Sequence, residues 1–165
     1  MNATKSYQSN QRCSAFQTII LGGLVAGILD ATNGVIAYYI AFGMNPIQAL
    51  QYIASGALGA ASFKGGLFTA GAGVLFHFFI AFTVATIFYF ASKLIPWIKE
   101  QFVISGLAYG AAVYLVMNYL VLPLSAVAPS PFSLGLFLNG VIGHALFVGL
   151  PIAWVASRSG NSYSQ

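Results

Sequence analysis

Three ionisable side chains interrupt long apolar stretches of this 165-residue chain, and these three are best suited to chemistry. Asp30 is one of two acidic residues, and His77 and His144 are the only histidines. A carboxylate with imidazoles can pass protons near neutral pH. Two imidazoles on different helices can also hold a haem iron from both sides.

Two histidines and an aspartate can bind zinc, but no second acid or cysteine lies near them in the sequence, so we predict no metal site. Haem b held by His77 and His144 is a minor alternative to having no cofactor. Against haem, Lys64 is the only cation predicted on the outer side that could pair with the propionates.

The composition indicates a membrane protein. The chain is 59% hydrophobic and 5% charged, whereas a soluble domain has about 25% charged residues. So few charges cannot cover a water-exposed surface, so lipid must solvate the chain. The net charge of +4 comes from isolated Lys and Arg residues without a basic patch, so we predict no nucleic-acid partner.

Four segments are long enough to cross a bilayer, which takes about 20 apolar helical residues. The first is too long for the apolar region of a cleaved signal peptide. We therefore predict an all-α membrane protein with four transmembrane helices, in one domain covering residues 1–165. The predicted spans cover residues 16–42, 66–91, 102–122 and 133–156.

A short helix is predicted between the first two spans, at residues 46–61. Asn45 can cap it, and Pro46 fits the first turn, where its missing N–H costs nothing. It is amphipathic and about 24 Å long at 1.5 Å per residue. We interpret it as an interfacial or re-entrant helix on the outer side.

The cations orient the four spans. With the N-terminus inside, only Lys64 is outside, which is a strong positive-inside bias. If the short helix also spanned, this bias would largely vanish. We therefore predict a multi-pass membrane protein with both termini cytoplasmic. The cations predicted inside are Lys5, Arg12, Lys93, Lys99 and Arg158.

Asp30 lies on a small, polar stripe of the first span, which should face the bundle because a lipid-facing aspartate costs about 3 kcal/mol. Asp30, His77 and His144 each lie about ten residues from the outer end of their span, or roughly 15 Å deep. This match predicts an intramembrane cluster of Asp30, His77, His144 and Asn33. Asn118 and Asn139 would form a second polar layer nearer the outside. The stripe contains Gly23, Ala26, Gly27, Asp30, Asn33, Gly34 and Ala37, and the opposite side carries Ile20, Leu24, Ile28, Val35 and Tyr39.

Two GxxxG pairs, Gly23 with Gly27 and Gly106 with Gly110, predict close helix packing. The spacing does not choose between packing within one chain and packing between chains. We expect a homo-oligomer or a larger membrane complex, with the lipid bilayer as the surrounding partner, because four helices are few for a self-sufficient transporter.

The second half, from FHFFIAFTVATIFYFASKLIP through GLAYG and LP to GHALF, resembles the YagU-like family of bacterial inner-membrane proteins. The resemblance covers roughly residues 73–154. It implies a polytopic helical fold in a bacterial inner membrane and no particular reaction.

Enzyme motifs such as GxSxG, HExxH and a phosphate-binding glycine loop are absent, so we predict no enzyme. The favoured role is a non-enzymatic accessory or scaffold subunit packed through its glycine-rich faces. The first alternative is a proton- or ion-conducting transport protein that uses Asp30, His77 and His144. The second is a bis-histidine haem electron-transfer subunit.

Overall fold

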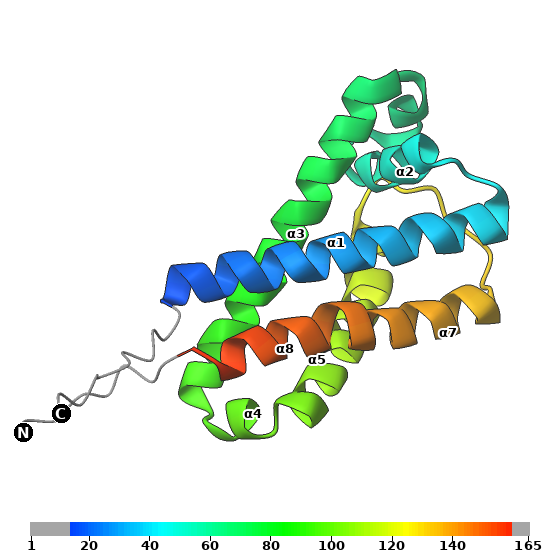
Figure 1. The fold of residues 1–165 in the computed structure, drawn as a ribbon. Helices are drawn as coiled ribbons and strands as arrows, with labels where there is room; N and C mark the ends of the chain where they lie inside the picture. Colours follow the sequence, from blue (N-terminus) through cyan, green and yellow to red (C-terminus); the bar gives the residue numbers. More distant parts are fainter. Residues whose placement is uncertain (1–13, 160–165) are drawn as a thin grey trace, which may run out of the picture.

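Four long helices dominate the computed structural model, which describes residues 14–159 (Figure 1). Each is long and apolar enough to cross a membrane, with a mean hydropathy of 1.6 to 2.1. Within this part of the chain there is no β-strand. The prediction of an all-α protein with four potential spans is therefore confirmed. The four helices are Ala15–Phe42 (α1), Gly66–Leu94 (α3), Phe102–Leu124 and Leu134–Ser157.

The third and fourth long helices each contain a π-helical segment just before a proline. These two helices comprise α5 (Phe102–Val116), η2 (Met117–Val121) and α6 (Leu122–Leu124), then α7 (Leu134–Gly143), η3 (His144–Gly149) and α8 (Leu150–Ser157). Proline has no N–H for the helical ladder and its ring crowds the preceding turn. The wider π turns before Pro123 and Pro151 accommodate this change without ending the helices. The third long helix therefore continues to Leu124, two residues beyond the approximate end predicted at residue 122.

The short helix α2 covers Pro46–Leu58 and continues as the 3₁₀ segment η1 (Gly59–Lys64). The Asn45 side chain accepts a hydrogen bond from the Gln48 backbone, and the Gln48 side chain accepts one from the Asn45 backbone. This reciprocal cap fixes the start of the helix. Gly59, with φ at +59°, ends the α-helix earlier than the predicted residue 61. A four-residue helix, α4 (Trp97–Glu100), forms the turn between α3 and α5.

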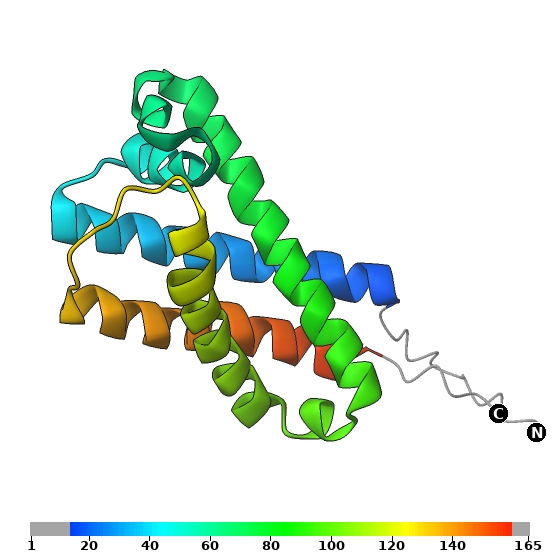
Figure 2. The ribbon, with the colours of Figure 1, turned by 180° about the vertical axis from the view of Figure 1, so that it is seen from behind.

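The helix α1 lies beside α7 and α8 and runs antiparallel to them, whereas α3 crosses this pair obliquely (Figures 1 and 2). The crossing lies where Gly23 and Gly27 meet the rings of Phe82 and Phe78. Beyond it, α1 and α3 diverge, and α2 lies between their ends. This divergence divides the bundle into a closely packed half and an open half.

The packed half contains the buried core. Its residues come from the second half of α3, from η3 and α8, and from the middle of α1. They are Ala26, Ala85, Phe88, Val148, Ile152, Ala153 and Ala156. Small side chains predominate, which allows the backbones to approach closely as in other membrane helix pairs.

The beginning of α1 and the end of α8 lie at the same end of the bundle (Figure 1). Lys93, Lys99 and Arg158 lie at this end, and Arg158 lies 3.5 Å over the ring of Trp154. Lys64 ends η1 at the opposite end of α3. Lys5 and Arg12, which also entered the orientation argument, lie outside the described residues.

Both GxxxG pairs make contacts within the chain. A Cβ added to Gly106 would lie 3.0 Å from the Gly149 carbonyl oxygen, and one added to Gly110 would overlap the His144 carbonyl oxygen. The Gly23 and Gly27 faces are covered by α3. Close packing through these four glycines therefore joins α1 to α3 and α5 to η3 and α8.

Candidate intramembrane site

The open half of the bundle encloses a cavity of about 1090 Å³. Its walls come from the second half of α1, from α2, from the middle of α3, from the ends of α5 and η2, and from α7 and η3. The proline-rich stretch of residues 125–133 also lines it. The cavity exists because α1 and α3 diverge beyond their crossing while their two glycines hold them together at it.

Asp30 and His144 meet at the wall of this cavity. The Asp30 Oδ1 lies 3.6 Å from the His144 Nδ1. The two side chains are only 18% and 21% exposed, and both line the cavity. The sequence prediction that brought these two residues together from the first and fourth spans is matched by this geometry.

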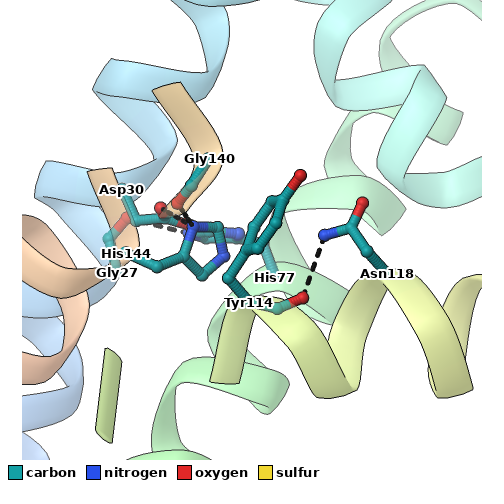
Figure 3. Close-up of polar contacts among 7 residues, drawn as sticks. All are labelled: Gly27, Asp30, His77, Tyr114, Asn118, Gly140 and His144. Atoms are coloured by element: carbon teal, nitrogen blue, oxygen red, sulfur yellow. Dashed lines mark hydrogen bonds and ion pairs between the residues drawn. The ribbon is translucent and has the colours of Figure 1, made fainter. Parts of the chain in front are cut away.

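The hydrogen bond of His144 defines which of its nitrogens carries a proton. Its Nδ1 lies 3.0 Å from the Gly140 carbonyl oxygen, which can only accept, so Nδ1 must donate (Figure 3). In the neutral ring, Nε2 then carries the lone pair. No hydrogen bond to Nε2 occurs among residues 14–159. His144 is therefore arranged to accept a proton at Nε2, with the Asp30 carboxylate close to the resulting positive charge.

His77 contacts the same helix as Asp30 but does not contact Asp30. Its Nε2 lies 2.8 Å from the Gly27 carbonyl oxygen, one turn before Asp30. Among residues 14–159, the structure contains no hydrogen bond or ion pair that joins His77 to Asp30 or His144. His77 does line the cavity. The three-residue cluster is thus a close pair, Asp30 with His144, and a separate histidine that bonds α1 one turn before Asp30.

The three asparagines that the sequence placed in or above the cluster all line the cavity. The Asn33 amide packs on the backbone of Gly143, where an added Cβ would lie 2.5 Å from the Asn33 Nδ2. Asn118 Nδ2 donates to the Tyr114 carbonyl oxygen at 3.0 Å. Asn139 joins Asn118 in the lining. Val35, which was predicted to face lipid, also lines the cavity, so that part of the stripe prediction was wrong.

Sequence reasoning missed three tyrosines in the wall. The Tyr114 ring lies 5.4 Å from the His144 ring and covers Gly140, so His144 lies between Asp30 and Tyr114 (Figure 3). The Tyr38 and Tyr52 rings lie 5.0 Å apart, which joins the end of α1 to α2. The sequence analysis did not assign Tyr38 to the site. Its spacing of eight residues from Asp30, about two helical turns, is the signal that both share a face.

The donor set fits bis-histidine haem poorly. Coordination through the Nε2 of His77 would break its hydrogen bond to Gly27, so only His144, whose Nε2 has no hydrogen bond among residues 14–159, is free to act as an axial ligand. No group of three or more metal-ligating side chains occurs among the described residues.

No family model, curated protein or solved structure matches the chain. The resemblance to the YagU-like family therefore stays a prediction, and the site is interpreted from its own geometry.

Proposed function

We propose that this chain is a small membrane transport protein that admits a solute to its cavity and couples the movement to protonation of the Asp30–His144 pair. The observation that carries the proposal is the cavity itself. A volume of about 1090 Å³ lies slightly above the usual range of ligand pockets, about 300–1,000 Å³. A purely structural polar network has no need of such a space beside its only acid.

The paired groups suit proton exchange. Ionisable residues at membrane depth mark ion and substrate pathways more often than structural sites. Protonation of His144 at Nε2 creates an imidazolium whose charge Asp30, at 3.6 Å, stabilises. When the proton leaves, Asp30 keeps its negative charge within the cavity and can attract a different cation.

The orientation that we propose follows the cations. Lys93, Lys99 and Arg158 lie at the end where α1 begins, and the positive-inside rule makes that end cytoplasmic. The cavity, α2 and Lys64 then belong to the outer half, and α2 lies at the outer interface. A bacterial inner membrane is the location that the YagU-like resemblance implies.

The scaffold role rests on glycine faces that are occupied within the chain, so transport is the better-supported proposal. A homo-oligomer would need other surfaces, since Gly23 and Gly27 contact Phe82 and Phe78.

Proton flux in proteoliposomes tests the proposal. A pH-sensitive dye inside the vesicles would report proton movement that follows an imposed pH gradient. We expect Asp30→Asn and His144→Gln to abolish the protein-dependent flux while helicity and monodispersity in detergent persist. Thr83→Val is the matched control, because the Thr83 hydroxyl bonds only the Phe79 carbonyl on its own helix. Equal flux in the Asp30→Asn protein would refute the proposal.

A further inference from the structure

We propose that the cavity binds an organic cation with an apolar body, and that Asp30 is the counter-charge for its positive centre. This inference names the substrate class of the proposed transport and therefore rests on that function. It is argued from the charges, the aromatic rings and the open volume of the cavity.

The fixed charges of the wall favour a cation. Asp30 is the one carboxylate in the lining, and no lysine or arginine lines the cavity in the described part of the chain. The described cations do not line it: Lys64 ends η1, Lys93 lies in the last turn of α3, Lys99 lies in α4 and Arg158 follows α8. An anion would meet the Asp30 charge, with no lysine or arginine in the described lining to offset it, in a medium of low dielectric constant.

The aromatic rings suit a cation that is not fully hydrated. Tyr38 and Tyr52 form one ring pair, and the Tyr114 ring lies beside the His144 ring. A cation close to such a ring face is attracted by the negative face of the ring, most strongly when the cation has lost its water. Phe76 and Phe79 add apolar wall.

The size of the cavity excludes a bare metal ion as the best-fitting occupant. An alkali cation needs several oxygen ligands at close range, whereas most of the lining is aliphatic or aromatic. A volume of about 1090 Å³ accommodates a molecule with several rings or alkyl arms. Such a molecule would place its charge near Asp30 and its body against the tyrosines and phenylalanines.

Gly34 provides a way to fill the cavity without disturbing the fold. It lines the cavity, and a Cβ added to it meets nothing within 4 Å. Gly34→Leu therefore extends a side chain into the open volume and leaves Asp30 unchanged. Gly71 is a matched control, since an added Cβ there also meets nothing within 4 Å but Gly71 does not line the cavity.

Binding of tetraphenylphosphonium to the purified protein in mild detergent tests the proposal, with tetraphenylborate as the anion of the same shape. Equilibrium dialysis against protein-free micelles corrects for partition into detergent. We expect saturable binding of the phosphonium only, weakened about tenfold or more in Asp30→Asn, a loss of about 1.4 kcal/mol. Gly34→Leu should weaken it similarly, whereas Gly71→Leu should bind like the original chain.

Equal binding of the two ions, or unchanged phosphonium binding in Gly34→Leu, would overturn the inference. Gly34→Leu keeps the test decisive if Asp30→Asn fails to fold. Proton flux without phosphonium binding would refute this substrate class and leave the transport proposal standing. Phosphonium binding without any proton flux would refute the transport proposal and leave the binding of an organic cation standing.

Discussion

Gly110 lies where α5 meets the backbone of η3, and this contact gives a sharp prediction for Gly110→Ala. An added Cβ would overlap the His144 carbonyl oxygen and would lie 2.7 Å from the Ala145 Cα. Carbon atoms in contact prefer about 3.5–4.0 Å. Both obstacles are backbone atoms, so no side chain can turn away to make room.

The cost follows from the separation that the methyl group would force. Relief of the overlap moves α5 and η3 apart by about 1 Å, and a gap of that size forfeits a quarter to a half of the dispersion energy at the contact. Overpacked sites of this kind lose about 1–3 kcal/mol. The displaced carbonyl belongs to His144 itself, so the substitution should also lengthen the Asp30–His144 distance.

Reversible unfolding in mixed micelles, followed by far-ultraviolet circular dichroism, measures this loss. Gly71→Ala is the control, because it gains the same helix propensity, about 1 kcal/mol relative to glycine, in open space. We expect Gly110→Ala to unfold well before Gly71→Ala. If the two variants were equally stable, α5 and η3 would not pack as described.

Three further predictions concern the helix ends and one buried hydroxyl. Tyr109→Phe should lose about 0.6 kcal/mol of unfolding free energy in the same assay, because the Tyr109 hydroxyl donates to the Val84 carbonyl oxygen at 2.7 Å. Unchanged stability would mean that this hydrogen bond does not stabilise the fold. Asn45→Ala should shorten α2 and cost about 1 kcal/mol, seen as faster amide hydrogen exchange in its first turn, whereas Asn45→Ser should retain the cap. Burial, and then the positive charge of Lys93, hold the pKa of Lys99 below its ordinary value. The protonated form of Lys99 is thus disfavoured in the folded protein. The contribution of Lys99 to stability therefore rises as the pH increases through the folded pKa, and it is complete above the unfolded pKa. Lys99→Met should flatten this part of the curve of stability against pH.

The hydropathy of the sequence defines the four spans because each apolar run is bounded by charged, polar or proline-rich segments. The cap at Asn45 was also predictable from the sequence, because both of its hydrogen bonds join residues three apart. The end of the third span was not readable, because a proline normally stops a helix and a π turn before Pro123 is a tertiary adjustment. The Thr83 and Thr86 hydroxyls donate to the carbonyl oxygens one turn back, a local bond that these residue types commonly make in helices.

Depth matching brought Asp30 and His144 to one site because both lie at similar distances from span ends on polar or small faces. Depth matching failed to exclude His77 from the pair, because its predicted depth is the same although its ring bonds the Gly27 carbonyl oxygen. The oblique crossing of α3 determines that difference, and a single sequence does not contain crossing angles. The cavity was unpredictable for the same reason, since it depends on how far α1 and α3 diverge.

The shared end of α1 and α8 makes the two faces of this protein chemically unequal. A tag at the end of α8 would lie at the end of the bundle remote from α2 and Lys64, so it can be detected without covering that end. Lys64 is the described amine on the cavity face. A membrane-impermeant acylating reagent added to intact cells should therefore label Lys64 if the cavity face is outside. Lys64→Arg should then remove this labelling.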